Sequence, residues 1–178
     1  MKQRVFSVLV ENTSGVLSHM SGLFSRRGYN IDSFSAGVTS DPRFTRCTIV
    51  ASGDELILEQ IEKQLNKLED VVKVTVLKIG ESVTRELMLV KVHSPKPQFE
   101  LSELVDRFHA KEVDVDYAHE SVVIEVTGTH GKLDSFLENL ESCNFEILEL
   151  ARTGITGLTR GIKDLVLVNE DGEISRTL

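Results

Sequence analysis

Hydrophobic and polar residues alternate along the first segment of the chain and then change to a helical spacing. Within residues 4–10, RVFSVLV, every second side chain shares a face, and the face of Phe6, Val8 and Val10 is the more apolar. Residues 16–27 instead carry apolar side chains at intervals of three and four and end with two arginines before a glycine, as is common at helix C-termini. The pattern therefore predicts a strand with one buried face, followed by an amphipathic helix.

The two periods keep alternating up to residue 78. We expect strands at 30–38 and 46–52, a helix that begins after Asp54, and a strand at 71–78. Asp54 precedes the helical pattern, where a carboxylate accepts hydrogen bonds from the first N–H groups of a helix. The order β-α-β-β-α-β predicts a ferredoxin-like unit, an antiparallel sheet covered on one face by two helices.

The second half of the chain repeats this order with little identity to the first. Its predicted strands and helices are 86–92 (strand), 97–110 (helix), 112–118 and 121–128 (strands), 131–143 (helix) and 145–153 (strand). The expected fold class is therefore α+β, with two ferredoxin-like βαββαβ units in tandem. The polar loop after the first strand of the first unit, which contains Asn12 and Gly15, has no counterpart in the second unit, where the sequence is HSPKPQF.

Domain borders follow from the repeat. We expect a first domain at 1–79, a second at 80–161 and a C-terminal extension at 162–178. The segment IGESVTR, residues 79–85, is the expected linker between the two domains. The extension contains a short strand pattern and a turn at NEDG, and it either pairs with a sheet edge or frays.

Composition narrows the class of protein. Of the 178 residues, 40% are hydrophobic and 27% are charged, as in globular proteins, and no apolar run approaches the ~20 residues that span a bilayer. The N-terminus, MKQRVFSVLVENTSG, lacks the apolar core and small-residue cleavage site of a secretory signal. We therefore expect a cytoplasmic protein without a membrane partner.

Charge is distributed unevenly between the two halves. Residues 1–80 hold 10 Lys and Arg against 9 Asp and Glu, a net charge of +1, whereas residues 81–178 hold 10 against 19, a net charge of −9. Nucleic-acid surfaces need clustered basic residues, and RNA-recognition sheets need aromatic residues on central strands, which 46–52 lacks. Nucleic acid is therefore not an expected partner. The acidic half is either a solvated face or a docking face for a basic partner.

The sequence contains no recognisable catalytic or metal-binding pattern. The five histidines fall on different predicted elements, and no HExxH, GxSxG, P-loop or paired-cysteine motif is present. Asp114 and Asp116 share a strand face and could imitate an acid/base pair, but a solvated sheet face explains them as well. An acylphosphatase-like enzyme would need an arginine-bearing loop after the first strand, where this chain has ENTSG. We expect no catalytic residues and no metal.

Two asparagine-bearing corners flank the first helix. Asn12 and Gly15 lie before its N-terminus, where unpaired N–H groups and partial positive charge suit a carboxylate. Asn30 lies after its C-terminus, and an asparagine side chain offers both donors and acceptors to a zwitterion. An Asx turn with a helix-capping loop would explain Asn12 and Gly15 equally well. From the residues alone, both interpretations stay open.

A family resemblance favours the interpretation of these corners as a binding site. Residues 10–37, VENTSGVLSHMSGLFSRRGYNIDSFSAG, resemble the amino-acid-sensing ACT domain of the regulatory (small) subunit of acetolactate synthase, also called acetohydroxyacid synthase. Further matching stretches follow in family order: DPRFTRCTIVASGD, LEQIEKQLNKLEDVVKV, RELMLVKV, VIEVTGTHGKLDSF and ARTGITGLTRG. The resemblance covers residues 4–161 and implies an N-terminal ACT domain with an ACT-like C-terminal domain.

The resemblance also implies a site and partners. Such subunits are homodimers that bind valine between paired ACT domains, and the family's ligand loops fall on Asn12, Gly15, Val16 and Leu17, with Asn30 and Ile31 from the second chain. The implied function is to activate the catalytic (large) subunit and to confer feedback inhibition by valine in branched-chain amino-acid biosynthesis. Thiamine diphosphate, Mg²⁺ and FAD are expected in that partner, and no cofactor in this chain. The alternative is a free-standing tandem ACT sensor that regulates another protein.

Overall fold

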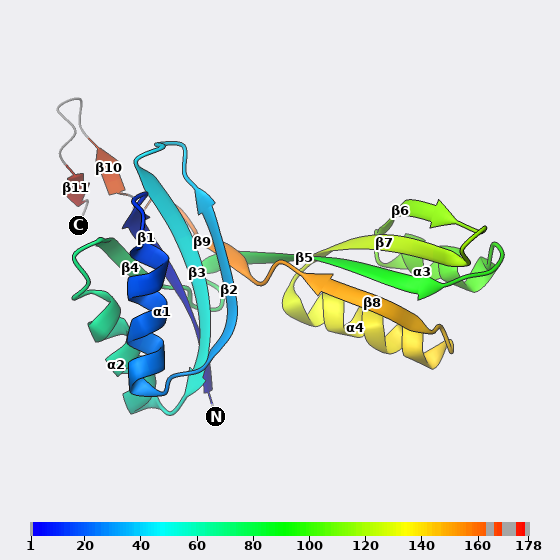
Figure 1. The fold of residues 1–178 in the computed structure, drawn as a ribbon, viewed down its shortest axis with the longest axis horizontal. Coiled ribbons are helices and arrows are strands. Elements are labelled where there is room, and N and C mark those ends of the chain that lie inside the picture. Colours follow the sequence, from blue (N-terminus) through cyan, green and yellow to red (C-terminus); the bar gives the residue numbers. More distant parts are fainter. Residues whose placement is uncertain (1, 163–165, 169–173, 177–178) are drawn as a thin grey trace. The chain divides into compact units, whose positions relative to one another are not determined.

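The computed structural model describes residues 2–162, 166–168 and 174–176. The chain divides into two compact units, one formed by Met1–Thr84 with Ile155–Leu178 and the other by Arg85–Gly154. In the described part of the chain each unit holds an antiparallel sheet and two helices (Figure 1). The α+β fold class predicted from the sequence is confirmed.

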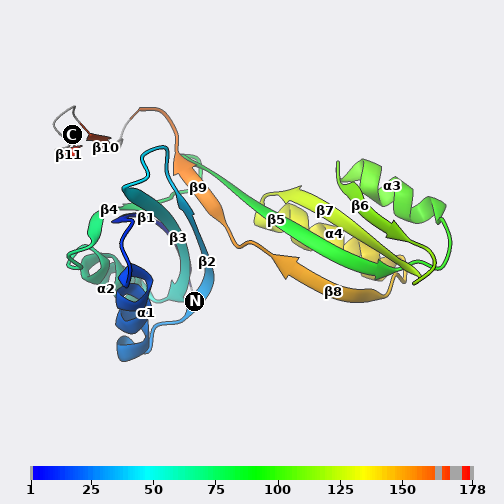
Figure 2. The same cartoon turned by 45° about the horizontal axis from the view of Figure 1, so that its top comes forward.

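The first unit has the predicted order of elements. They are β1 (Lys2–Glu11), α1 (Val16–Arg27), β2 (Ile31–Val38), β3 (Phe44–Gly53), α2 (Glu55–Leu65) and β4 (Val71–Val76). The strands form one sheet in the order β2-β3-β1-β4, and all of the pairings are antiparallel. Helices α1 and α2 cover the same face of this sheet (Figures 1 and 2).

The core of the first unit lies between that face and the helices. Phe6, Val8 and Val10 of β1 are at most 1% exposed, which confirms the buried face predicted from the alternation. Residues Val16, Met20, Leu23 and Phe24 of α1, Leu58, Ile61 and Leu65 of α2, and Cys47, Ile49 and Ala51 of β3 complete the buried cluster. Removing this apolar surface from water is the main force that holds helices and sheet together.

The ends of the helices follow local sequence signals. The Asp54 carboxylate accepts a hydrogen bond of 2.8 Å from the Ile57 N–H, as expected of an N-cap. At the end of α1, Gly28 has φ 65° and its N–H donates to the carbonyl of Ser25, while the Tyr29 N–H donates to that of Phe24. A left-handed C-cap of this kind favours glycine. The helices are 9 to 13 residues long, and none in the described part of the chain could span a membrane.

The second unit repeats the architecture. Its elements are β5 (Ser82–His93), whose first residues belong to the first unit, α3 (Phe99–Arg107), β6 (Lys111–Asp116), β7 (Ser121–Gly128), α4 (His130–Ser142) and β8 (Ile147–Arg152). The sheet order β6-β7-β5-β8 matches that of the first unit, position for position. Met88, Val90 and Val92 of β5 pack against both helices in a separate core.

A returning segment changes the domain assignment. From Ile155 onward the chain belongs to the first unit, whereas the sequence analysis placed 80–161 in the second domain. The Ser35 hydroxyl donates to the Ile155 carbonyl at 2.9 Å, and the Ile155 N–H donates to Ser33 Oγ at 3.1 Å. Strand β9 (Thr156–Thr159) pairs with β5 and lies on the side of the first sheet away from its helices (Figure 2).

The expected linker and extension also differ in detail from the structure. Within 79–85, Gly80 has φ 85° in a turn and β5 already begins at Ser82, so that strand leads from one unit into the other. In the extension, β10 (Val166–Val168) pairs with β11 (Ile174–Arg176) as a hairpin. The rest of the expected extension after Ile162 lies outside the described residues.

Candidate functional site

Asn12 lies in the loop between β1 and α1 and is held by the turn that joins β2 to β3. Its backbone N–H donates to the Arg43 carbonyl at 2.7 Å, and its side-chain Nδ2 donates to the Pro42 carbonyl at 2.9 Å. Its Oδ1 accepts a hydrogen bond of 3.1 Å from the Thr45 hydroxyl. Since an amide offers two N–H groups and two lone pairs, one of each stays available in a fixed orientation.

Gly15 immediately precedes α1 and has a left-handed backbone, with φ 96° and ψ −18°. A Cβ here would meet no atom within 4 Å, so the backbone conformation, and not lack of space, requires glycine. No side chain in the described residues caps this helix, and its first turn has no acidic residue. The Asn12 side chain therefore does not cap this helix, and the helix N-terminus presents N–H groups and partial positive charge.

Val16 and Leu17 begin the helix on different sides. The Val16 side chain is 4% exposed and belongs to the core, so this residue offers its backbone N–H to the loop. Leu17 is 52% exposed and offers an apolar side chain at the surface. Asn12, Gly15, Val16 and Leu17 thus form one corner with polar groups, helix N–H groups and an apolar contact.

Asn30 and Ile31 lie at the opposite end of α1. This helix has 12 residues, so its two ends are about 18 Å apart. Asn30 Nδ2 donates to Asp32 Oδ1 at 2.7 Å, and Ile31 packs partly buried against the core. The structure therefore does not bring these two residues to the Asn12 corner within one chain.

Asp32 organises the second corner. Its carboxylate accepts hydrogen bonds from the Ser52 hydroxyl, from Gln3 Nε2 at 3.2 Å and from Asn30. These hydrogen bonds, with Ser52 first, hold the pKa of Asp32 below its usual value because they favour the ionised form. The Asn30 side chain is thereby oriented at the start of β2.

Strand β2 connects the two corners and forms an edge of the sheet. It begins next to Asn30, and the turn that follows it supplies the Pro42 and Arg43 carbonyls that bind Asn12. Phe34 and Val38 on β2 are 38% and 61% exposed. Among the strands that the structure describes, only β3 pairs with β2, so its outer edge presents unpaired backbone groups.

The structure also shows the surroundings of the other candidate groups, namely possible metal ligands, the Asp116 carboxylate and the Cys47 thiol. The described residues contain no cluster of three or more His, Cys, Asp or Glu suited to a metal. Asp116 accepts hydrogen bonds from the His119 ring and backbone N–H, which lower the pKa of its carboxyl. Cys47 is buried, which raises the pKa of its thiol to about 11, so little reactive thiolate exists at neutral pH.

The residues that hold Asn12 were not among those predicted from the sequence. Pro42 and Thr45 lie 30 and 33 positions away, and no local spacing marks them. The signal lies in the strand register, because β1 pairs antiparallel with β3 and Val10 lies opposite Thr45. Residues just after Val10 must therefore meet residues just before Thr45.

Comparison with known proteins places both units in one family. Residues 6–73 match a family model described as "AHAS small subunit-like ACT domain", and residues 85–161 match one described as "Small subunit of acetolactate synthase". The chain belongs to the acetolactate synthase small-subunit family. The family resemblance drawn from the sequence is thus confirmed, and the site described above lies in the ACT domain of a small (regulatory) subunit.

Relatives and a solved structure agree with this assignment. The "Acetolactate synthase isozyme 3 small subunit" of Escherichia coli is 46% identical over 162 residues, which cover 90% of this chain and 98% of that protein. The "Probable acetolactate synthase small subunit" of Methanothermobacter thermautotrophicus is 46% identical over 164 residues, 90% of this chain and 95% of that protein. The crystal structure of the small subunit from Thermotoga maritima superposes with a TM-score of 0.81 at 37% identity, covering 91% of this chain and 99% of that one.

Proposed function

We propose that this small subunit binds the catalytic large subunit of acetolactate synthase, raises its activity and makes it sensitive to valine. The pathway served is the synthesis of valine, leucine and isoleucine in the cytoplasm. Family membership supports the partner, since a small subunit implies a large one. The observation that carries the valine part is the uncapped N-terminus of α1 at Gly15, beside the fixed amide of Asn12.

Each part of valine finds a matching group at this corner. The carboxylate accepts hydrogen bonds from the first N–H groups of α1, where the helix dipole favours negative charge. The remaining lone pair of Asn12 Oδ1 accepts from the ammonium group, and Leu17 contacts the isopropyl group. Burying that group contributes roughly 1.5–3 kcal/mol, and each hydrogen bond to a charged group roughly 1.5–3 kcal/mol.

The affinity expected from these contacts suits a metabolite sensor. After the costs of immobilising the ligand and ordering the loop, about −4 to −8 kcal/mol is left, a dissociation constant between about a millimolar and a micromolar. A single missing methylene changes affinity by only ~1–3 kcal/mol. Leucine and isoleucine are therefore the competitors that a titration has to include.

A homodimer through β2 completes the site. If the open edges of two β2 strands pair antiparallel about a two-fold axis, the start of one strand lies beside the end of the other. The end of β2 runs into the turn that holds Asn12, so Asn30 and Ile31 of the second chain reach the Asn12 corner of the first. This arrangement accounts for two corners that one chain keeps about 18 Å apart.

In this proposal the chemistry belongs to the partner. The large subunit holds thiamine diphosphate, Mg²⁺ and FAD, and it condenses two pyruvates, or pyruvate with 2-oxobutyrate, with release of CO₂. The small subunit supplies no catalytic group and no cofactor. Valine favours a dimer state that supports the active enzyme less well, a coupling of about 1–3 kcal/mol.

The test is acetolactate formation by the cognate catalytic subunit with this chain and increasing valine. Asn12→Ala is expected to retain activation and to raise the valine concentration for half-inhibition at least about tenfold. Asn139→Ala is the matched control, because among the described residues that amide bonds the Ser135 carbonyl of its own helix, in the second unit. The proposal fails if the chain leaves the rate unchanged with and without valine.

A further inference from the structure

A row of hydroxyl groups crosses the first sheet on the face away from its helices. In the strand register Ser7 lies opposite both Thr48 and Thr75, and Ser35 lies opposite Thr48. Ser7 and Thr48 are 2% and 1% exposed. The middle of this polar row is therefore buried, although the two helices pack on the other face of the sheet, and its outer members Ser35 and Thr75 are partly buried.

Arg46 stands in the next row and reaches into this polar face. Its Nη1 donates a hydrogen bond of 2.9 Å to Ser7 Oγ. Within the described residues Arg46 forms no ion pair, and its burial lowers the pKa of the guanidinium. Arg46 is partly buried. A guanidinium has five N–H donors, and partial withdrawal of a cation from water without an anionic partner has a cost.

A small cavity lies where these groups converge. Ser7, Arg46, Thr75 and Thr159 line it with polar atoms, Leu77 and Leu158 line it with apolar ones, and its volume is about 180 Å³. Thr159 comes from the returning segment, which forms the wall opposite the sheet. Since a water occupies about 30 Å³ of liquid, the space accommodates a tetrahedral oxyanion together with waters.

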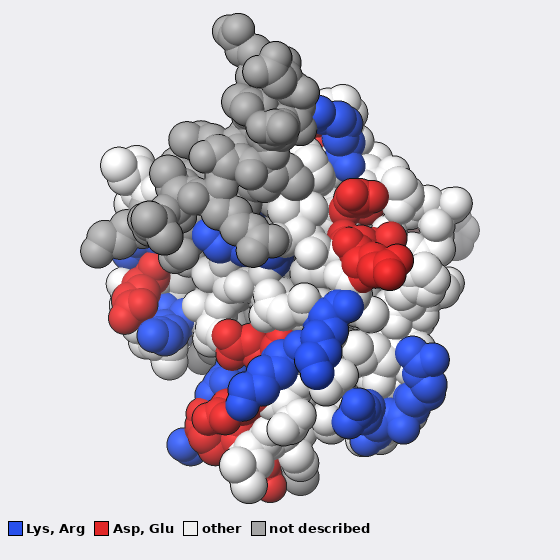
Figure 3. Space-filling view, turned by 90° about the vertical axis from the view of Figure 1, so that its left-hand side faces the viewer, with Lys and Arg blue, Asp and Glu red and all other residues white. Residues whose placement is uncertain are grey.

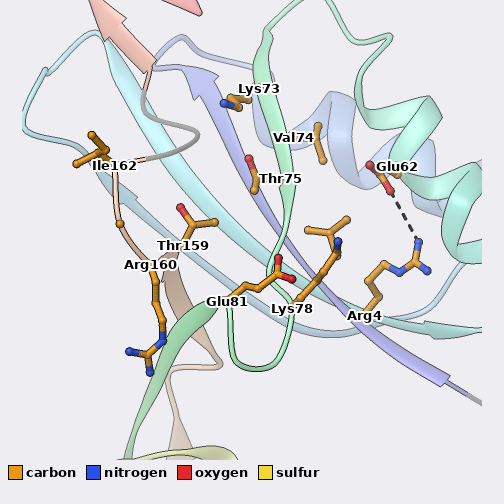
Figure 4. A pocket seen from close by; sticks show the side chains of 12 residues that line it. Arg4, Glu62, Lys73, Val74, Thr75, Lys78, Glu81, Thr159, Arg160 and Ile162 are labelled. Atoms are coloured by element: carbon orange, nitrogen blue, oxygen red, sulfur yellow. Dashed lines mark ion pairs between the residues drawn. The ribbon is translucent and has the colours of Figure 1, made fainter. Parts of the chain in front are cut away.

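The cavity continues into a wider groove of about 1000 Å³. Thr75 and Thr159 belong to both, and Figure 4 shows them on facing sides of the groove. Lys73, Lys78 and Arg160 also line the groove, together with the acidic Glu81. Arg4 lies at its far end with Glu62 as an ion-pair partner at 3.7 Å. The face of the molecule in Figure 3 carries both basic and acidic side chains, so that face is not a uniformly basic surface.

We propose that this cavity binds a phosphate group, either free phosphate or the phosphoryl end of a phosphate monoester whose body lies in the groove. Arg46 supplies the charge and a planar fork of donors. The hydroxyls of Ser7, Thr75 and Thr159 donate to the remaining oxygens. A polypeptide carboxylate fits less well, because the returning segment covers the cavity and three hydroxyl donors exceed what one carboxylate needs.

This phosphate site is separate from the proposed valine site. Successive side chains of a strand point to opposite faces, and on β3 the Thr45 hydroxyl bonds Asn12 while the Arg46 guanidinium bonds Ser7. The phosphate site can therefore be tested independently of the proposed response to valine.

The experiment is calorimetric titration of the intact chain with inorganic phosphate and, separately, with glycerol 3-phosphate, in a buffer without phosphate. Both the wild-type chain and the Arg43→Gln control are expected to bind phosphate saturably and within about twofold of each other. Arg43 is exposed in the β2–β3 turn and pairs with Asp41, so this variant makes the same change in charge away from the cavity. Arg46→Gln is expected to weaken binding at least about tenfold.

The two ligands identify the source of the phosphate group. Tighter binding of the ester shows that the groove holds the rest of the ligand, and equal binding shows that free phosphate suffices. A Thr75→Val variant, which keeps every charge, is expected to weaken binding about three- to tenfold. If circular dichroism shows that Arg46→Gln does not fold, the Thr75→Val variant alone tests whether phosphate binds in the cavity.

Three outcomes would overturn the phosphate site. The first is no saturable binding of either ligand by the wild-type chain. The second is equal weakening by Arg43→Gln and Arg46→Gln, which would indicate general surface attraction. The third is binding of an Asp- and Glu-rich peptide in place of phosphate, which would make the groove a protein-docking surface.

Discussion

The two units share a fold and differ in what the fold carries. Each has the same βαββαβ order of elements and the same order of strands in its main sheet, and among the described residues each has a cluster of 13 buried apolar residues between sheet and helices. The loop before the first helix differs most. In the first unit it contains Gly15 with φ 96°. Within the described chain neither α1 nor α3 has a side-chain cap, but the first turn of α1 has no acidic residue, whereas that of α3 contains Glu100.

In the second unit the corresponding loop is closed by its own residues. Ser94 is 1% exposed, its N–H donates to the Glu120 carbonyl and its hydroxyl donates to the Lys96 carbonyl at 3.0 Å. Gln98, which precedes α3, has an extended backbone with φ −123° instead of the left-handed one of Gly15. The loop thus lacks the oriented amide and the glycine corner of the first unit, as the sequence comparison of the loops indicated.

The sheet faces away from the helices differ as well. In the first unit Ser7 and Thr48 are buried under the returning segment. In the second, Leu89 is 38% exposed, and Lys91 pairs with Glu149 at 2.7 Å on the surface. The two units therefore share the buried cluster that specifies the fold, whereas the loop and the covering segment, where the valine and phosphate sites are proposed, differ between them.

The largest expected effect comes from equivalent truncations in the two cores. Ile49 on β3 and Ile124 on β7 are both 0% exposed, and replacing either by alanine should cost about 2–5 kcal/mol of its unit's stability. Denaturant unfolding followed by circular dichroism measures this cost. Ile49→Ala should also remove valine binding in calorimetry, whereas Ile124→Ala should leave it. Equal loss of binding in both variants would show that the two units do not act separately.

The next effect tests the covering segment, which only the first unit has. A Cβ on Gly157 would lie 2.8 Å from Leu77 Cδ1 and 2.9 Å from the Val83 carbonyl oxygen. Because the backbone there cannot yield easily, Gly157→Ala should destabilise the chain by about 1–3 kcal/mol. Gly131→Ala on α4 meets no atom within 4 Å and is the control, expected to be neutral or stabilising. Thermal unfolding of both variants measures the difference.

That segment also marks a limit of sequence analysis. Local periodicity predicted β1, α1 and the buried face of Phe6, because the spacing of apolar residues along a half-buried strand or helix follows the period of that element. The stretch TGITGLTRG has no such period. Its return to the first unit depends on hydrogen bonds between Ile155 and the Ser33 and Ser35 side chains, more than 100 positions away.

The candidate site likewise has a part that could be predicted from local sequence and a part that could not. The glycine corner and the Asn12 amide could be predicted from residue types and from the helix that follows them. The Pro42 carbonyl and Thr45 hydroxyl that orient Asn12 required the strand register. The role of Asn30 and Ile31 stays a prediction, because it depends on a second chain.

A smaller effect is expected at Gly15, the residue that distinguishes the two loops. At φ 96° an alanine is strained, so Gly15→Ala should cost about 1–2 kcal/mol and weaken valine binding by distorting the helix N-terminus. Gly22→Ala within α1 is the control, since its Cβ meets no atom within 4 Å and alanine favours helices. Calorimetry with valine measures both variants. Unchanged affinity in Gly15→Ala would place valine elsewhere.

The smallest expected effect is on the pH dependence of stability, through Asp32 at the second corner. The pKa of Asp32 is lowered by hydrogen bonds from Ser52, Gln3 and Asn30, so the ionised form is favoured in the folded chain. Its contribution to stability is therefore present above the unfolded pKa of about 3.9 and is lost as pH falls through the lower folded pKa.

Asp32 is largely exposed, so the contribution should be below about 1 kcal/mol. Asp32→Asn should consequently lower stability near neutral pH by that amount and match the wild-type chain at the acid end. Urea unfolding between about pH 3 and pH 7 measures the difference. A gap between the two chains that widens toward low pH would have the wrong sign and would show that the carboxylate does not hold the Asn30 corner.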